Sequence, residues 1–253
     1  MMKQICLITD GCSNVGMNPA AAAAHAYMEG IVVNVIGVVD QGELGLHGAR
    51  EVEEIASAGG GMHRIVPSWE LRRTVQMMTR QTVAMTVRQA VSQKLKAIVG
   101  SGDVEDLPPE KRAKVVEIMD EMSEKTPLRV ALVIDTSASM KPKLHAVEEA
   151  IRDLMLSLEA REGKSELCVF HFPGTGAKGL EAELDVEWTD QLAKINNLFY
   201  KLNMRGATPT GPAIMQAVQY FGCPAAPLES GAEDPPVPSE RDESEGMLRD
   251  YVI

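Results

Sequence analysis

Three short segments of this sequence carry oxygen-rich side chains of the kind that bind a hard metal ion. The first is Asp135-Thr-Ser137-Ala-Ser139, which directly follows the run 129–134, apolar after its first residue. An apolar run of this length is typical of a buried strand, and in an open parallel sheet ligands bind beyond the carboxyl ends of the strands. One carboxylate and two hydroxyls in a single turn therefore predict an all-oxygen site, which suits Mg²⁺, with Mn²⁺ as an alternative.

The two other segments have simpler interpretations when each is taken alone. Gly206-Ala-Thr208-Pro is a turn-rich loop directly before a helical pattern, and Pro and Thr are common where helices begin. The apolar run 5–9 ends in Asp10-Gly11, which is also a common way to terminate a strand. Asp-x-Ser-x-Ser itself can serve as a helix cap.

Together, the three segments resemble the metal-ion-dependent adhesion site of von Willebrand factor A domains. That family combines Asp-x-Ser-x-Ser after a strand, Gly-x-Thr-Pro before a helix, and a strand that ends in Thr-Asp-Gly, and all three are present here. The resemblance implies that Ser137 and Ser139 are direct hydroxyl ligands and that Asp135 anchors the ion. It further implies that Thr208 is a switchable ligand and that Asp10 is a carboxylate acting through water.

The order of the three segments departs from the order in that family. Ordinary members begin with the Asp-x-Ser-x-Ser strand, whereas here the Thr-Asp-Gly strand opens the chain. Residues 1–100 therefore supply the later half of the fold and residues 128–222 the earlier half. We predict a circular permutation in which the segment 101–127 joins the halves within one chain. The alternative is a domain swap between two chains, and a monomer is favoured over a swapped dimer.

The pattern along the chain predicts a doubly wound α/β fold. Short β-branched runs alternate with helical patterns, which is typical of parallel βαβ units. We predict a mostly parallel six-stranded sheet with helices on both faces and an antiparallel last strand, because only a glycine-rich loop precedes that strand. The predicted strands are 4–9, 31–38, 62–65, 129–134, 166–172 and 183–188, and the predicted helices are 19–28, 49–58, 69–99, 143–160, 190–202 and 212–221.

The longest helical pattern, 69–99, carries a stripe of apolar residues, so one side of this helix is expected to be buried. The members of the stripe are Leu71, Val75, Met78, Met85 and Leu95. The charged segment 101–127 predicts a linker with one docked helix over 110–123. Residues 224–253 are acidic and rich in Pro, which predicts a largely disordered tail.

Composition and charge exclude several functional classes. The formal net charge is −11 and the cations are scattered, which does not fit a protein that binds nucleic acid or an anionic membrane. No apolar run approaches the roughly 18 residues of a membrane span, and the first residues do not form a signal peptide, so we expect a soluble, cytoplasmic protein. The cysteines show no CxxC spacing, and Cys6 and Cys168 are expected to be buried reduced thiols.

These features favour a binding module over an enzyme. The sequence has no phosphate-binding glycine loop and no Asp-x-Asp pair after a strand, and its histidines are dispersed, with His171 interpreted as a core residue. A Mg²⁺-dependent phosphoryl-transfer enzyme is therefore the weaker alternative. The resemblance implies a partner protein that presents an Asp or Glu to the ion. It also suggests a regulatory subunit of an AAA-type ATPase as an alternative, and a sporulation-related role by analogy with small members of endospore-forming bacteria.

Overall fold

The computed structural model describes residues 1–11, 13–39, 46–99, 103–174, 182–195 and 207–222. The strands are β1 Met2–Thr9, β2 Ile31–Val38, β3 Gly60–Val66, β4 Leu128–Asp135, β5 Ser165–Phe172 and β6 Glu183–Thr189. The helices are α1 Pro19–Met28, α2 Leu46–Ala58, α3 Leu71–Val99, α4 Pro109–Lys125, α5 Leu144–Glu159 and α6 Thr210–Phe221. Short 3₁₀ turns are η1 Ser68–Glu70, η2 Val104–Asp106, η3 Ala138–Lys143 and η4 Leu192–Lys194.

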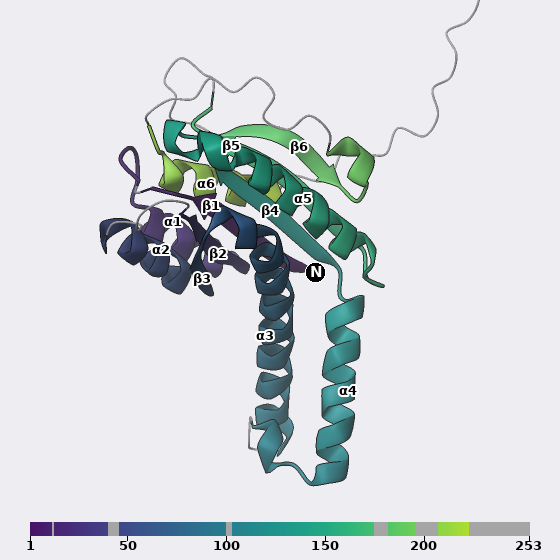
Figure 1. Cartoon of the computed structure of the whole chain (residues 1–253). Helices are drawn as coiled ribbons and strands as arrows, with labels where there is room; N and C mark the ends of the chain where they lie inside the picture. The colour runs from purple at the N-terminus through teal and green to yellow at the C-terminus, as the bar shows by residue number, and fades with distance from the viewer. Residues whose placement is uncertain (12, 40–45, 100–102, 175–181, 196–206, 223–253) are drawn as a thin grey trace, which may run out of the picture. The chain divides into compact units, whose positions relative to one another are not determined.

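The six strands form one sheet in the order β3-β2-β1-β4-β5-β6 (Figure 1). The first five strands in this order are parallel to one another, and β6 is antiparallel to β5. The predicted fold class and the predicted antiparallel edge are therefore confirmed. The centre of the sheet is the pair β1 and β4, in which Met2 lies opposite Leu128 and Ile8 opposite Ile134. Strands from distant parts of the chain thus share one ladder.

Both faces of the sheet are buried, which explains why its central strands are almost continuously apolar. Along β4, Val130, Leu132 and Ile134 belong to a core that includes residues of α3 and α5. Ala131 and Val133 belong to the opposite core, which includes residues of α1, α2 and α6. The period-two alternation of a strand therefore sends successive side chains of β4 into two separate helix-covered layers.

Local signals at the helix ends agree with most of the predicted boundaries. At the start of α1, the Asn18 side chain accepts a hydrogen bond from the backbone N–H of Ala21, and Pro19 occupies the first turn. The helix predicted over 190–202 is wrong at its start, where the described residues form only the short turn η4. The remainder of that range, from residue 196, lies outside the described residues.

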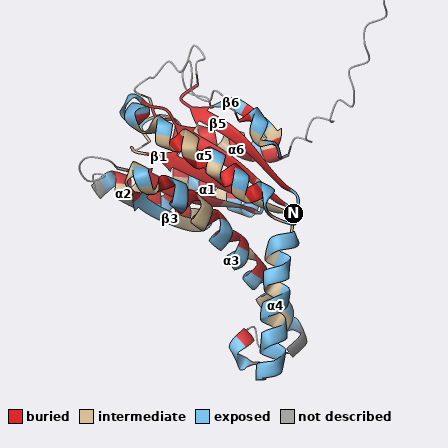
Figure 2. Ribbon diagram, turned by 45° about the vertical axis from the view of Figure 1, so that its right-hand side comes forward, coloured by how far each residue is buried: buried red, intermediate tan, exposed pale blue. Residues whose placement is uncertain are grey.

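The apolar stripe of α3 is buried over only part of the helix. Leu71, Val75 and Met78 are almost fully buried, whereas Met85 is 52% exposed and Leu95 is half-buried. The prediction for Met85 was therefore wrong. The reason is that α3 continues past the sheet and lies beside α4 there, so a periodic pattern indicates a helix face without showing how far the core extends along it (Figures 1 and 2).

The segment after α3 contains the predicted helix, here α4, which begins one residue earlier and ends two residues later than expected. Cys6 and Cys168 are buried free thiols as predicted, and burial raises the pKa of the Cys6 thiol to about 12. Cys12, Cys223 and the tail 224–253 lie outside the described residues. No helix within the described ranges has the length and apolar character needed to cross a membrane.

A close approach between β2 and β3 gives a test of the fold. A Cβ atom on Gly61 would lie 2.2 Å from the backbone oxygen of Val33, so Gly61→Ala must displace backbone. We expect this variant to lower the free energy of unfolding by about 2 kcal/mol, measured by urea denaturation. Gly11→Ala is the matched control, because no heavy atom lies within 4 Å of the added Cβ. Equal stability of the two variants would contradict the β2–β3 register.

Candidate metal centre

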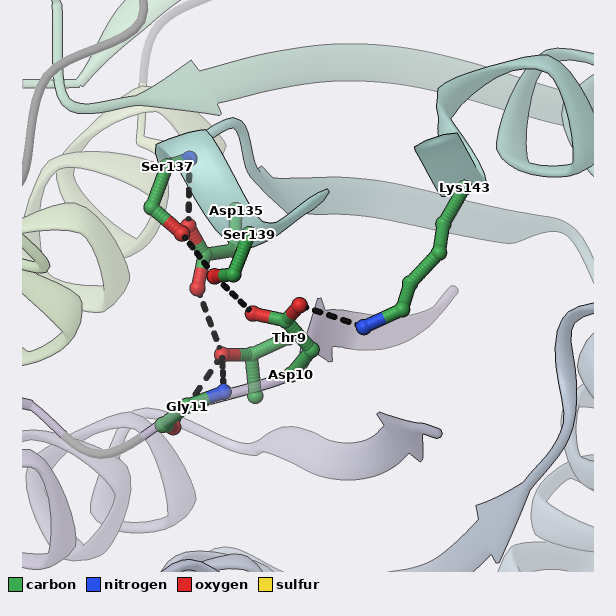
Figure 3. A network of polar contacts seen from close by, with 7 residues as sticks. All are labelled: Thr9, Asp10, Gly11, Asp135, Ser137, Ser139 and Lys143. Carbon is green, nitrogen blue, oxygen red and sulfur yellow. Dashed lines mark hydrogen bonds and ion pairs between the residues drawn. The ribbon is translucent and has the colours of Figure 1, made fainter. Parts of the chain in front are cut away.

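The strand order places a topological switch point at the carboxyl ends of β1 and β4, and this place is called the crevice below. The chain leaves β1 towards β2 on one side, and it leaves β4 towards β5 on the other. At such a switch point the two connections diverge and leave room for a ligand. Asp10 follows β1, and the turn that contains Ser137 and Ser139 follows β4, so the structure brings two of the three predicted segments to this point (Figure 3).

Asp135, the last residue of β4, is fully buried and fixed by two hydrogen bonds. Its Oδ1 accepts from the backbone N–H of Ser137 at 2.8 Å, and its Oδ2 accepts from Thr9 Oγ1 at 2.7 Å. The first bond forms the tight turn that carries the two serines. The second bond joins β4 to β1, because Thr9 is the last residue of that strand.

The two serine hydroxyls and Asp10 continue the network. Ser139 Oγ donates to Asp10 Oδ1 at 2.8 Å, and the Oγ atoms of Ser137 and Ser139 lie 3.2 Å apart. Because Ser139 gives its only hydroxyl proton to Asp10, Ser137 must be the donor between the serines. Four of the five residues predicted for the metal site, Asp10, Asp135, Ser137 and Ser139, therefore lie together at one crevice, joined to one another directly or through Thr9 (Figure 3).

Lys143, at the end of η3, adds a positive charge that sequence analysis missed. Its Nζ lies 2.5 Å from Asp10 Oδ2, and the two side chains are only 11% and 2% exposed. Asp10 therefore makes direct contacts with Ser139 and Lys143. Spacing in the sequence gave no signal for Lys143, because its partner Asp10 lies 133 positions away in the chain.

Thr208 belongs to a different set of hydrogen bonds. Its backbone N–H donates to Asn14 Oδ1 at 2.8 Å, and the backbone N–H of Asn14 donates to the Thr208 carbonyl. The buried residue Thr208 is thus tied to the loop that follows Asp10. Two residues later, the buried hydroxyl of Thr210 has no hydrogen-bond partner among the described residues. The loop before α6 and the first residue of that helix therefore each present a buried threonine, and the hydroxyl oxygen of Thr210 has no partner among the described residues.

Close packing fixes the loop after β1 against the start of α6. A Cβ atom on Gly211 would lie 2.2 Å from the backbone oxygen of Met17, and one on Gly16 would meet the Pro212 ring. In addition, the Glu51 carboxylate accepts a hydrogen bond from the backbone N–H of Ser13. Partial burial raises the pKa of Glu51. Only residues without side chains fit at Gly16 and Gly211, so these glycines explain how the loop after Thr9-Asp10-Gly11 and the Gly-x-Thr-Pro segment before α6 come together.

The donor set of the crevice fits a hard divalent cation. Its converging groups are carboxylates and hydroxyls, which are the oxygen donors that Mg²⁺ and Mn²⁺ prefer. Burial raises the pKa of Asp135, and the nearby charge of Asp10 raises it further, while hydrogen bonds from Ser137 and Thr9 lower it. Among the described residues no cationic side chain is paired with Asp135, so a bound cation would offset the cost of burying this carboxylate.

Other metal and catalytic groups are absent from this crevice as far as the structure describes it. The described residues contain no cluster of three or more His, Cys, Asp or Glu that could hold a metal ion. His171 is buried on β5 as predicted for a core residue, and its Nδ1 lies 2.9 Å from the Asp185 carboxylate. Any metal site here must therefore depend on the serine and threonine hydroxyls in addition to the two aspartates.

The chain is similar to two bacterial proteins along most of its length. It is 47% identical over 221 residues to the Bacillus subtilis (strain 168) protein YabS, which covers 87% of this chain and 89% of YabS. The crystal structure of a protein from Alicyclobacillus acidocaldarius subsp. acidocaldarius matches with a TM-score of 0.79 and 44% identity, covering 87% of this chain and 93% of that chain. No family model matches the chain.

A structure of proximal thread matrix protein 1 from the mussel byssus, described as having a zinc-occupied MIDAS motif, is also similar. Its identity is 15% and its TM-score is 0.26. A similarity at this level is too low to show a shared fold.

The ion pair of Lys143 with Asp10 gives a prediction for the metal-free protein. Lys143→Met leaves the Asp10 carboxylate buried without its cation, so we expect the free energy of unfolding in EDTA to fall by about 3 kcal/mol. Lys141→Met is the control, because Lys141 lies on the same turn and is exposed. Thermal and urea unfolding of both variants would measure the effect. If the two variants are equally stable, the ion pair does not hold the crevice together.

Proposed function

We propose that this chain, which belongs to the same family as the Bacillus subtilis protein YabS, is a metal-dependent protein-binding module. In this proposal the fold is a von Willebrand factor A-like domain in circularly permuted order, and the crevice between β1 and β4 is an adhesion-type site for one Mg²⁺ or Mn²⁺ ion. The site binds the carboxylate of an Asp or Glu on a partner protein.

The observation that carries the proposal is the convergence of Asp10, Asp135, Ser137 and Ser139. These residues come from two strands far apart in the sequence, and the hydrogen bonds between Thr9 and Asp135 and between Ser139 and Asp10 join them. In the simpler interpretations, Asp10-Gly11 only terminates a strand and Asp-x-Ser-x-Ser only caps a helix. Neither role needs a contact with the other motif. Their direct hydrogen bonding supports a common role for both motifs.

The arrangement of the chain supports the permuted order. β1, from the segment that would come late in an ordinary member, pairs along its length with β4, from the segment that would come first. α4 lies directly before β4 and ends at Lys125, so the segment 101–127 spans the joint between the former ends of the fold. The metal crevice lies at the carboxyl ends of the strands, whereas this joint lies at the amino end of β4.

Each residue then has a definite task. Asp135 anchors the ion through its buried carboxylate, Ser137 and Ser139 supply neutral hydroxyl ligands, and Thr208 joins the ligand set from the loop before α6. Asp10 acts on the ion through a water molecule and is not a direct ligand. When bound, the ion supplies an electrophilic position that accepts an oxygen from outside the chain. Because the nearest ligands include few charges, positive charge remains to attract a carboxylate.

Binding fits the side chains at the crevice better than catalysis does. The network drawn in Figure 3 consists of Asp, Ser, Thr, Gly and Lys residues. Within the described residues it includes no histidine or thiol that could serve as a base or a nucleophile. Lys143 forms an ion pair with Asp10, so its side chain is already engaged with a carboxylate of the network.

The experiment that tests metal binding is a calorimetric titration with Mg²⁺. We expect about one ion per chain for the wild type and none for Asp135→Asn. The amide of that variant can still accept from the Ser137 N–H, so the turn should survive. Asp153→Asn is the control, since Asp153 lies on α5 and pairs with Arg72. At a Mg²⁺ concentration 100 times Kd, the wild type should gain about 2.7 kcal/mol of folding stability.

The opposite result is equally clear. If Asp135→Asn binds Mg²⁺ as tightly as the wild type while both remain folded by circular dichroism, then the crevice is not the metal site.

The partner's carboxylate has its own test. A protein that is captured by the wild type in Mg²⁺ should be released by EDTA and should not be captured by Asp135→Asn. Changing one Asp or Glu of that protein to Asn or Gln should then lower its affinity at least tenfold, measured by calorimetry with purified components. If every such amide variant binds normally, a carboxylate is not what the module recognises.

A further inference from the structure

Lys143 is the cationic side chain in the network of polar contacts drawn in Figure 3. Its Nζ lies 2.5 Å from Asp10 Oδ2, in a pair that is almost completely buried. The other oxygen of Asp10, Oδ1, accepts the hydroxyl proton of Ser139. The two oxygens of Asp10 therefore have different partners, and one of these partners carries a full positive charge.

The burial of Lys143 limits how this charge can act on a ligand. The ammonium is engaged with Asp10, and only 11% of the side chain is exposed, so little of it is left for contact with a molecule that arrives from solvent. Ser139, in contrast, is exposed. A ligand from outside can therefore reach the serine side of the network, where the charge of Lys143 acts on it over a distance.

The charge of Lys143 changes the charge balance at the proposed metal site. When ionised, Asp10 and Asp135 together carry two negative charges, which equal the two positive charges of Mg²⁺ or Mn²⁺. Two uncompensated carboxylates would leave little net attraction for a third carboxylate from a partner. The ion pair with Lys143 offsets the charge of Asp10, and salt screens a buried pair of this kind only weakly.

We propose that Lys143 is a positioning residue that makes the crevice selective for a carboxylate ligand. This inference rests on the proposed function, because it concerns the same metal site. The ammonium engages Asp10 Oδ2 in an ion pair instead of leaving it free to approach the ion. In the charge balance of the described network, one positive charge then remains for the carboxylate of the partner.

This role predicts opposite effects on two affinities when the charge of Lys143 is removed. The uncompensated Asp10 carboxylate attracts a cation more strongly, so the affinity for the metal ion should rise. The same carboxylate reduces the positive charge that an anionic ligand meets, so the affinity for a carboxylate should fall. A residue that only held the crevice together would lower both affinities when replaced.

Calorimetric titration with Mn²⁺ measures the first affinity. Lys143→Gln keeps an N–H donor for Asp10 without the charge, and we expect it to bind Mn²⁺ roughly tenfold more tightly than the wild type. Lys143→Met should change the affinity in the same direction, whereas Lys143→Arg keeps the charge and should restore binding close to that of the wild type. Lys141→Met is the matched control, because it removes an exposed lysine from the same turn.

Acetate is the probe for the second affinity, because it carries the same carboxylate group as an Asp or Glu side chain. With the protein saturated with Mn²⁺ and the ionic strength held constant with chloride, acetate that displaces water from the ion lowers the relaxation rate of the water protons. We expect Lys143→Gln to need at least threefold more acetate than the wild type for half of this effect. Lys141→Met should need the same amount as the wild type.

The outcomes separate this inference from the proposed function. Tighter binding of Mn²⁺ together with weaker binding of acetate in Lys143→Gln, with unchanged circular dichroism, would support the role of Lys143. If that variant loses affinity for both ligands, or if neither affinity changes, Lys143 does not set the selectivity, although the metal site of the wild type stands. A wild type that binds no Mn²⁺ would overturn both proposals.

Discussion

The parallel pairing of β1 with β4 is the contact on which the rest of the structure depends. It joins the two parts of the chain into one sheet, and it sets the ends of both strands side by side. The hydrogen bond from Thr9 to the buried carboxylate of Asp135 lies one position beyond the last pair of this ladder, Ile8 and Ile134. If the register changed by one residue, the side chains would exchange faces, and Asp10 would no longer reach Ser139.

The crevice holds two carboxylates, Asp10 and Asp135, that are buried from water. Asp135 is buried, and its pKa is raised by burial and by the charge of Asp10, whose own carboxylate is compensated by Lys143. Asp10 therefore has a cationic partner, whereas Asp135 has none among the described residues. In our account a divalent ion neutralises the second carboxylate, so metal binding and the stability of the fold are linked.

The sequence predicts the sheet well because its strands are short, apolar and clearly separated. The grouping of Asp10 with Asp135 and the serines was implied by the resemblance to von Willebrand factor A domains, and the fold brings them together because the carboxyl ends of parallel strands share one edge. It could not place Met85, because helical periodicity shows a face but not where the sheet ends. It also missed Thr9 and Lys143, whose importance comes from contacts with residues distant in sequence. The helix α4 was predicted, but the distance by which α3 and α4 extend beyond the sheet is visible only in three dimensions (Figure 1).

The most direct test of the proposed site is a crystal structure with Mn²⁺ in the crystallisation solution, with data collected for anomalous scattering. Our account predicts one strong anomalous peak in the crevice, within bonding distance of Ser137 Oγ and Ser139 Oγ and beside the Asp135 carboxylate. A map without a peak there, or with its strongest peak elsewhere on the chain, would contradict the assignment of this crevice as a metal centre.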